Sequence, residues 1–368
     1  KSLISTILGT GLLLILAGHV SLGVYNVKFS NAERADQYAW SFSYFLYYGL
    51  GFWMFLHFYR HSSKLVQLIH SLSNLEIYFT RSDPHLFRDV SVVASIVVFS
   101  AVGENTFVNL RHVPIGPQDE KLMADLNVTR WELYFSRAYK LWGSLVPFHH
   151  VTNIFLFLSD KLVWFAWNYT DLFIVVFSRA LYFKFQALVF QGKITLLSPG
   201  ADNSKWELFA KDFEILRRTL NDINNFLSPM IFATFGINLY YLCLQVHNSL
   251  NPFTNSTSMG SFYSFWGVAH VVLRTFLGSV AASRINDWVY SVTELIRQCP
   301  DEFYNSEVQR TENFLNGNVI GLSGLGCFTI TKPMVIKITG VVMSFELVLL
   351  QVLELSVTKN SQCSRVHQ

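Results

Sequence analysis

Charged residues and cysteines are scarce in this sequence, and each shortage excludes a class of protein. Only 14% of the 368 residues are charged, whereas 51% are hydrophobic and 33 are phenylalanine. Soluble domains do not have this composition. The net charge of +3 is too small to indicate a nucleic-acid partner, and no basic stripe interleaved with aromatic residues is present. The sequence therefore predicts an integral membrane protein that does not bind nucleic acid.

The cysteines and the motifs give no sign of catalysis. Cys243, Cys299, Cys327 and Cys363 show neither metal-ligand spacing nor a paired framework. The sequence has no nucleotide-binding loop, no catalytic triad and no His-Glu zinc signature. We therefore expect no enzyme activity, no cofactor and no bound metal.

Seven apolar segments are long enough to cross a bilayer, because a membrane helix needs about 20 residues. They are 3–24, 41–59, 90–110, 146–177, 224–249, 259–282 and 334–354. The first is too long for the core of a signal peptide, and no linker divides the chain. Since the sequence does not begin with methionine, we expect the natural N-terminus to lie upstream. The pattern predicts an all-α integral membrane protein with seven transmembrane helices.

An odd number of crossings places the two termini on opposite sides of the membrane. Basic residues after the fourth and sixth segments mark those loops as cytoplasmic, although others crowd the loop after the third. The sequons Asn127-Val128-Thr129 and Asn255-Ser256-Thr257 fall in two loops that would then be extracellular, as glycan acceptors must. We predict an inside N-terminus and an outside C-terminus, opposite to a G-protein-coupled receptor.

The stretches 178–222 and 285–333 are predicted to be cytoplasmic helical extensions. Within the first, Trp206 to Arg218 places Leu208, Phe209, Phe213 and Leu216 at helical spacing opposite a charged face. That face could join subunits or pack against a neighbouring helix of the same chain, and the sequence leaves both open.

The last apolar segment carries polar residues at membrane depth, where they are costly and usually face a bundle interior or a water path. Phe345, Val348, Leu349 and Val352 form one helical stripe, with Glu346 and Gln351 beside it. Such a stripe can line a pore that closes by dewetting. A lipid-facing or bundle-facing helix with two tolerated polar residues is the alternative.

Several stretches resemble a known family. Ser344 to Val352 (Ser-Phe-Glu-Leu-Val-Leu-Leu-Gln-Val) is similar to the C-terminal signature of insect gustatory receptors, which is Thr-Tyr, five mostly apolar residues and Gln-Phe. Stretches that resemble the sugar-receptor branch are Trp167 to Phe173 with Ser178 to Leu181, Gly321 to Gly324 with Cys327, Phe328 and Thr331, and the weaker Gly103-Glu104 and Asn238 to Tyr240 with Cys243 and Gln245. They keep the family's order along the chain.

The resemblance implies a homotetrameric, ligand-gated, non-selective cation channel of the plasma membrane that acts as a sugar taste receptor. Its partners would be a sugar, permeating cations, the bilayer and copies of itself or sibling gustatory receptors. The implied organisation is a ligand-binding bundle (1–282, with extensions at about 178–222), a cytoplasmic anchor (283–333), a pore helix (334–354) and an extracellular tail (355–368). The implied pore and gate residues are Phe345, Val348, Gln351 and Val352. Valine at 352, where the family has Phe, removes bulk from the gate.

A sugar pocket should combine flat aromatic surfaces with a few buried hydrogen-bonding groups. Counting helix rise from the outer ends of the segments selects the candidates Glu104, Trp142, His149, His150, Asn153, Tyr241, Gln245, Tyr263 and Trp266, with Trp40, Tyr44 and Tyr47 as further ones. Structural roles stay open for several of them. Glu104 could be neutral or paired with Arg111, Trp142 and Tyr263 could belong to the interfacial aromatic belt, and the two histidines could be solvated.

Two inner features are expected to be structural. Trp167 to Asp171 lies roughly 30 Å below the top of its helix, so we expect it to hold helices together or to couple the pocket to the cytoplasmic platform. Asn168 is then a buried sequon that carries no glycan. Arg274 is expected to pair with a carboxylate or a carbonyl.

Rival membrane classes fit less well. A G-protein-coupled receptor would need an outside N-terminus and an Asp-Arg-Tyr motif, and a secondary transporter would show internal repeats with Gly- or Pro-broken helices. The alternative that remains is an odorant-receptor-type or heteromeric gustatory subunit gated by a ligand other than a sugar.

Overall fold

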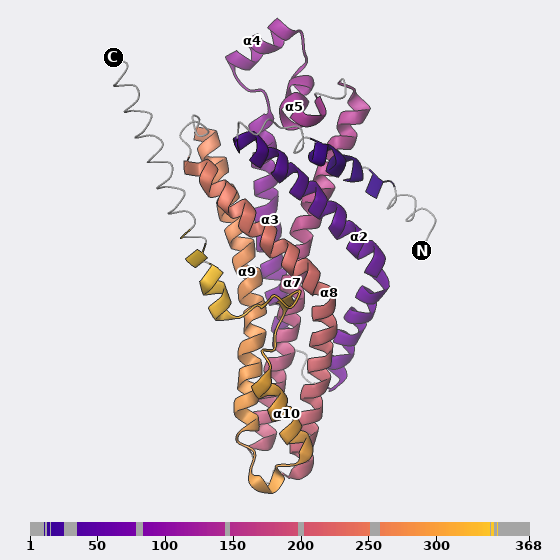
Figure 1. Ribbon diagram of the computed structural model, residues 1–368, viewed down its shortest axis with the longest axis vertical. Helices are drawn as coiled ribbons and strands as arrows, with labels where there is room; N and C mark the ends of the chain where they lie inside the picture. The colour runs from indigo at the N-terminus through magenta and orange to yellow at the C-terminus, as the bar shows by residue number, and fades with distance from the viewer. Residues whose placement is uncertain are drawn as a thin grey trace, which may run out of the picture. The chain divides into compact units, whose positions relative to one another are not determined.

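Long helices make up almost all of the described chain in the computed structural model (Figure 1). The residues described are 11, 13–14, 16–25, 35–78, 84–143, 148–197, 202–250, 258–338, 340–341 and 344. The long helices are α2 (Ala35–Tyr78), α3 (Pro84–His112), α7 (His150–Leu196), α8 (Asn203–Leu250) and α9 (Ser258–Ile296). The short elements are α4 (Pro117–Leu126), α5 (Arg130–Ala138), α6 (Lys140–Gly143), η1 (Asp301–Phe303), α10 (Ser306–Gly317), β1 (Ser323–Gly324) and β2 (Phe328–Thr329).

The chain divides into two compact units. Unit 1 contains residues 1–66 and 95–172, and unit 2 contains 67–94 and 173–368. Each unit is considered by itself below.

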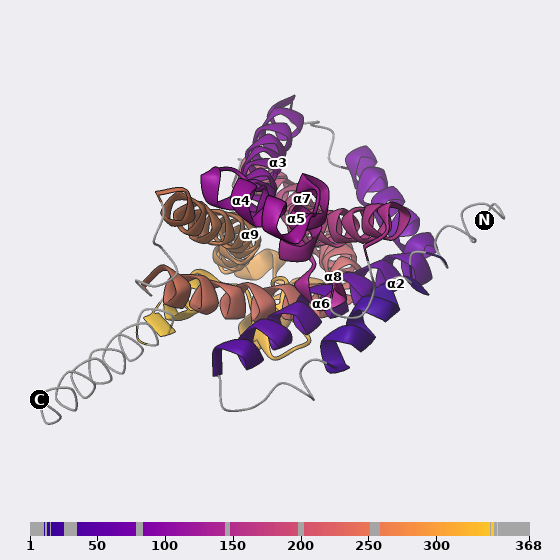
Figure 2. The same ribbon diagram turned by 90° about the horizontal axis from the view of Figure 1, so that it is seen from above.

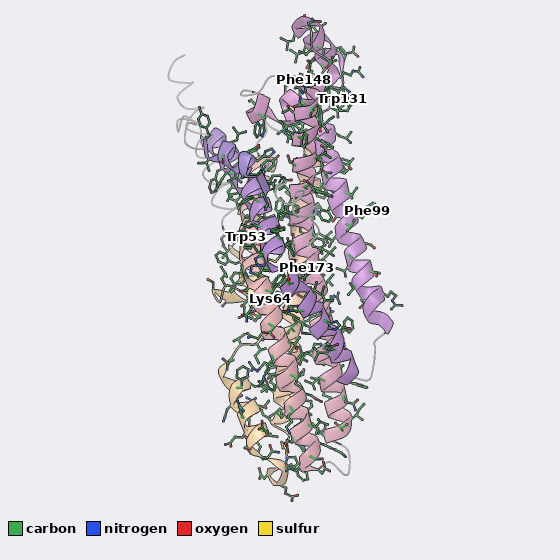
Figure 3. The ribbon with its side chains drawn as sticks, turned by 90° about the vertical axis from the view of Figure 1, so that its right-hand side faces the viewer. Trp53, Lys64, Phe99, Trp131, Phe148 and Phe173 are labelled. Carbon is green, nitrogen blue, oxygen red and sulfur yellow. The ribbon has the colours of Figure 1, made fainter. Side chains whose placement is uncertain are left out.

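Four helices are long and apolar enough to cross a membrane, among the residues that the structure describes. They are Arg88–His112, His150–Leu196, Asn203–Leu244 and Phe265–Ile296, and they overlap the third to sixth predicted segments. Phe99 on α3 is 76% exposed and points away from the neighbouring ribbons, as a lipid-facing side chain would (Figure 3). The segment 41–59 lies inside α2, which is not one of the four. The seven-helix count and the orientation stay predictions.

Helix α7 is 47 residues long, which corresponds to about 70 Å at 1.5 Å per residue. The hydrocarbon core of a bilayer is only about 30 Å thick. Residues 178–196 and 203–222 of the predicted extension are helical, and their cytoplasmic location stays a prediction. The prediction for 285–333 is confirmed only in part, because the region after α10 forms the hairpin β1–β2 instead of a helix.

The N-terminal part of α8 buries one face within unit 2. Trp206, Phe209, Phe213 and Leu216 are at most 5% exposed, and the Phe213 ring lies 6.5 Å from the Phe185 ring of α7. Leu208 is 60% exposed, so its predicted place in this stripe is wrong. The buried positions follow each other by three, four and three residues, and Leu208 is one residue away from this row, about 100° round the helix. This face therefore packs inside its own chain.

The hairpin β1–β2 attaches the segment before residue 332 to α8 in unit 2. Its strands are antiparallel, with Ser323 opposite Thr329, and Leu325 and Gly326 have φ of 50° and 72° at the turn. Two positive φ values in succession are typical of the tight hairpin turns that match strand twist. The Ser323 N–H donates to Asn224 Oδ1 (2.7 Å), and the Leu325 N–H donates to Ser228 Oγ (2.6 Å). The chain is thus fixed to α8 just before the helical residues 332–338.

Helices α4 and α5 follow each other at one end of unit 1, with α4 above α5 in Figure 1 and both seen from above in Figure 2, and we call them the α4–α5 hairpin. Arg137 donates to Asp119 Oδ1 at 2.6 Å, and Thr129 caps α5 with a capping box that includes Glu132. The Arg137 guanidinium holds the pKa of Asp119 below its ordinary value. This pair therefore stabilises the hairpin above the ordinary carboxyl pKa, and the contribution is lost as the pH falls through the lowered value.

The sequon at Asn127 gives a direct test of the orientation. Asn127 is exposed and ends α4 in the left-handed conformation (φ 50°), which leaves its side chain accessible. We expect the protein from eukaryotic cells to lose mass on treatment with peptide N-glycosidase F, because the enzyme removes its glycans. Asn127→Gln should abolish the part of this mass shift that comes from the glycan on Asn127. Asn168→Gln is the matched control and should change nothing, because Asn168 is 8% exposed and donates to the Trp164 carbonyl. An unchanged shift in Asn127→Gln would show that Asn127 carries no glycan, and the absence of any shift in the wild-type protein would count against the predicted orientation.

Candidate functional site

The predicted ligand residues are divided between the two units. Unit 1 holds Glu104, Trp142, His149, His150 and Asn153, and unit 2 holds Tyr241, Gln245, Tyr263 and Trp266. The side chains of Gln245, Tyr263 and Trp40 lie outside the described residues, as do the predicted pore residues Phe345, Val348, Gln351 and Val352. The site is therefore built from unit 1.

A buried cluster of rings and hydrogen bonds surrounds His19 in unit 1. We call His19, Tyr44, Tyr48, Trp142 and Ser159 the His19 cluster. The His19 ring stacks on Tyr48 with 4.0 Å between the centroids and 3° between the planes, and it meets Trp142 edge-on at 5.2 Å. His19 and Ser159 are fully or almost fully buried, at 0% and 2% exposed. The cluster combines flat aromatic surfaces with buried polar groups, which is the predicted composition of a sugar pocket.

The hydrogen bonds of the cluster determine the tautomer of His19. The Ser159 hydroxyl donates to the Leu156 carbonyl (2.8 Å), so its oxygen accepts from His19 Nε2 at 2.9 Å. His19 Nδ1 is then the acceptor, and it faces the Tyr44 hydroxyl at 2.7 Å and the Trp142 indole N–H at 3.0 Å. Indole N–H is only a donor, which agrees with a neutral ring protonated at Nε2.

A second network, centred on Lys161, adjoins this cluster. The Lys161 ammonium lies 2.8 Å from Asn105 Oδ1, 3.1 Å from Asn109 Oδ1 and 3.0 Å from Asp160 Oδ2. An ammonium has three donors, and each of them has an acceptor. The Asp160 carboxylate also accepts from the Tyr48 hydroxyl at 3.2 Å, which joins the two networks. The Tyr134 hydroxyl of α5 donates to Asn109 Oδ1 of α3 at 2.9 Å, which connects α5 to α3.

The other predicted residues of unit 1 have varied surroundings. Glu104 is half-buried, and its Oε2 accepts from the Trp164 indole at 3.3 Å. Asn153 is buried at 9% exposed, while His149 and His150 are exposed and lie outside the His19 cluster. The His150 ring meets the edge of Phe148 at 4.9 Å. Phe148 lies with Trp131 at the same end of unit 1, both against Phe135 (Figure 3).

In unit 2, Tyr241 lies edge-on to Tyr240 at 5.5 Å, and Trp266 stacks beside Phe262 at 6.3 Å. Arg274 Nη2 donates to Asn238 Oδ1 at 2.6 Å, and each residue is 2% exposed. The prediction that Arg274 pairs with a carboxylate or a carbonyl is confirmed, with an amide carbonyl as the acceptor.

The motif from Trp167 to Asp171 packs against α2 within unit 1. Thr170 is fully buried, and its hydroxyl lies 2.8 Å from the Ala166 carbonyl and 3.2 Å from the Met54 sulfur. The Trp167 ring meets Tyr47 edge-on at 5.9 Å. The prediction that this motif holds helices together is confirmed for α7 and α2.

The sequence prediction missed His19, Asp160 and Lys161, although a signal for each was present. A histidine inside the first apolar segment and an Asp-Lys pair inside the fourth are ionisable groups at membrane depth, which are rare and usually functional. The described residues contain no group of three or more metal-ligating side chains that could hold an ion.

Comparison with solved structures identifies the fold. The insect olfactory receptor OR5 from Machilis hrabei matches with a TM-score of 0.66 and 15% identity, over 96% of this chain and 90% of that one. The same receptor in complex with eugenol matches with a TM-score of 0.71 and 16% identity, over 96% and 91%. The fold is therefore that of an insect chemoreceptor.

Comparison of sequences identifies the family. The model of the trehalose receptor family matches residues 4–363, so the chain belongs to that family, within the sugar-receptor branch of the insect gustatory receptors. Relatives in Drosophila melanogaster include gustatory receptor for sugar taste 64b, 26% identical over 72% of this chain and 65% of its own length. Gustatory receptor for sugar taste 61a is 25% identical (93% and 78%), and gustatory receptor 5a for trehalose is 25% identical (53% and 43%). The family is one of chemoreceptors and not a class of enzymes.

Proposed function

We propose that this protein is a taste receptor that acts as a sugar-gated, non-selective cation channel in the plasma membrane, assembled as a homotetramer. The observation that carries the proposal is the match to the trehalose receptor family over residues 4–363. The His19 cluster supports it, because its ring faces and paired polar groups have the chemistry that sugar recognition requires.

The ligand would exchange hydrogen bonds with the outer polar residues. Trp142 of the His19 cluster and Glu104 would act in unit 1, with Asn153, His149, His150, Tyr241, Gln245, Tyr263 and Trp266 as further candidates. A buried donor or acceptor that gave up its present partner to a ligand without a matching hydroxyl would be left unpaired, which is costly, so the buried groups among them would disfavour such molecules.

The gate would lie on the pore helix, 334–354, at Phe345, Val348, Gln351 and Val352. A ring of four valines can close a pore by dewetting. The attachment of the hairpin to α8 through Asn224 and Ser228 would let a movement of α8 draw the pore helix outward. A sugar would shift the gate only by its difference in affinity for the two states.

One observation favours a second candidate. Of the two structures of the olfactory receptor OR5, the one that matches with the higher TM-score contains eugenol, which is not a sugar. Under this alternative the chain would be a subunit gated by another small molecule, alone or together with sibling gustatory receptors.

Whole-cell recording from cells that express the full-length protein alone tests the proposal. We expect application of sugars, trehalose among them, to evoke a cation current without added G protein. Silence to every sugar in surface-expressed protein, together with a current on co-expression of a sibling receptor or on addition of eugenol, would favour the second candidate.

Trp142→Phe should weaken the response to sugar. The change keeps a flat ring but removes the indole N–H that lies 3.0 Å from His19 Nδ1 and 2.9 Å from the Tyr44 oxygen. The hydrogen bond that this N–H would donate to the bound sugar is worth about 1 kcal/mol, so its loss should raise the half-maximal sugar concentration roughly fivefold. Trp131→Phe is the matched control and should leave it unchanged, because Trp131 is 64% exposed on α5. Equal responses of the two variants would exclude Trp142 from the site.

A further inference from the structure

A cavity of about 410 Å³ lies within unit 2, where α8 and α9 meet the end of the hairpin and the helical residues that follow it. Its walls are Phe232, Phe235, Gly236, Asn238, Leu239 and Leu242 of α8, Thr275 of α9, Phe328 of β2, and Met334, Lys337, Ile338 and Val341. Its volume falls in the range of about 300–1,000 Å³ that is usual for small-molecule sites. None of the predicted ligand residues whose side chains are described lines it.

The lining is chemically unsuited to a sugar. Most of the wall is aliphatic or aromatic, and the Asn238 carbonyl already accepts from Arg274 at 2.6 Å. The Thr275 hydroxyl is buried and has no hydrogen-bond partner among the described residues. A sugar would have to bury many hydroxyls here without acceptors, which is costly. The cavity is suited instead to a hydrocarbon chain.

The wall of the cavity carries a positive charge. Lys337 lines it and is exposed, and no described carboxylate lies within ion-pair distance of its ammonium. The nearby Lys332, in contrast, pairs with Asp287 at 2.8 Å. An apolar cavity with one cation among its described wall residues matches a molecule with a hydrocarbon tail and an anionic head.

The surroundings indicate where such a molecule would come from. The α8 and α9 residues of the cavity belong to apolar segments of membrane-spanning length. Lys337 lies in the last predicted segment, 334–354, near the end that we place on the cytoplasmic side. Anionic phospholipids concentrate in the cytoplasmic leaflet. Each buried methylene of a lipid tail contributes about 0.8 kcal/mol to binding. The bilayer supplies this ligand at high local concentration.

We propose that this cavity binds an anionic membrane phospholipid, with an acyl chain between α8 and residues 334–341 and its phosphate at Lys337. Because residues 334–341 begin the predicted pore helix, the bound lipid would set the ease with which that helix moves away from α8. The regulatory part rests on the proposed channel function, whereas binding of the lipid does not.

Gly236→Leu narrows the cavity, because Gly236 is part of its wall. A Cβ added at Gly236 meets no atom within 4 Å, so a leucine can project into the space without a clash at its Cβ. Leucine also favours a helix more than glycine does, so α8 should fold. Gly49→Leu is the matched control, since Gly49 is also a helical glycine with nothing within 4 Å of an added Cβ, but lies on α2 in unit 1.

The experiment uses the full-length protein in vesicles that contain a phosphatidylserine with a photoactivatable diazirine in one acyl chain. After irradiation, mass spectrometry should find label on peptides from 232–242 and 328–341. Gly236→Leu should lower this label about tenfold, whereas Gly49→Leu should keep it. Lys337→Gln should reduce labelling by phosphatidylserine but not by the phosphatidylcholine analogue, and Lys337→Arg should restore it.

Several results would overturn the proposal. One is the absence of label from both peptides in the wild-type protein. Another is equal labelling of Gly236→Leu and the wild-type protein. A third is the detection of cross-links between two copies of the chain at these residues in place of lipid label. Equal use of both headgroups would overturn the role of Lys337. The labelling experiment does not measure current, so it tests lipid binding independently of the proposed channel function. Sugar-evoked current in Gly236→Leu then tests regulation, and we expect a changed threshold.

Discussion

Lys161→Met should lower the free energy of unfolding by about 2 kcal/mol, because removal of one member of a buried ion pair leaves the other charge uncompensated. Fully buried pairs cost about 3–5 kcal/mol when broken in this way. The Lys161 and Asp160 side chains are 20% and 23% exposed, so water screens part of the loss. Methionine keeps the length and apolar stem of lysine, which limits the effect to the ammonium and its three acceptors.

The midpoint of unfolding of the purified protein in SDS measures this change, and surface expression gives a second readout. Lys193→Met is the control on the same helix, because Lys193 is exposed and should tolerate the change. The double variant Asp160→Asn, Lys161→Met should recover part of the loss, since it leaves no charge unpaired. Equal midpoints for Lys161→Met and Lys193→Met would show that the network does not stabilise unit 1.

Asn238→Leu should cost about 2–3 kcal/mol, which is the upper part of the range for a hydrogen bond to a charged group. Arg274 and Asn238 are each 2% exposed, and 2.6 Å separates Nη2 from Oδ1. Leucine has the same branched side-chain shape as asparagine, although it is larger, and it cannot accept a hydrogen bond. The guanidinium would therefore lose a short, charge-assisted bond in a place that water does not reach.

Two further variants separate this effect from a change of packing. Asn238→Asp keeps an acceptor for Arg274 and should retain most of the stability. Asn221→Leu, at an exposed position of α8, should be near neutral. A loss in Asn238→Asp as large as in Asn238→Leu would mean that the shape of the side chain, and not its carbonyl, stabilises unit 2.

Features that depend on neighbouring residues along the chain were predictable. The apolar runs at 90–110, 146–177, 224–249 and 259–282 predicted the four described helices that are long and apolar enough to cross a membrane. The residues Trp167 to Asp171 and the glycine-rich stretch before the last segment indicated the family. Periodicity placed Phe209, Phe213 and Leu216 on one buried face of α8, but included Leu208, which is exposed. A short sequence window fixes the direction of a helical face only approximately, because neighbouring positions differ by about 100°.

Which polar groups meet was decided by the tertiary structure. His19 contacts Ser159 and Trp142, which lie 140 and 123 residues further along the chain. Asn224 of α8 holds the backbone of Ser323, 99 residues away. Such contacts depend on how each helix is rotated about its axis and on its height beside its neighbours, and no local pattern encodes either quantity. The sequence by itself therefore determined a helical membrane receptor of the gustatory family, and the packing of the helices alone determined the His19 cluster, the Lys161 network and the cavity beside Lys337.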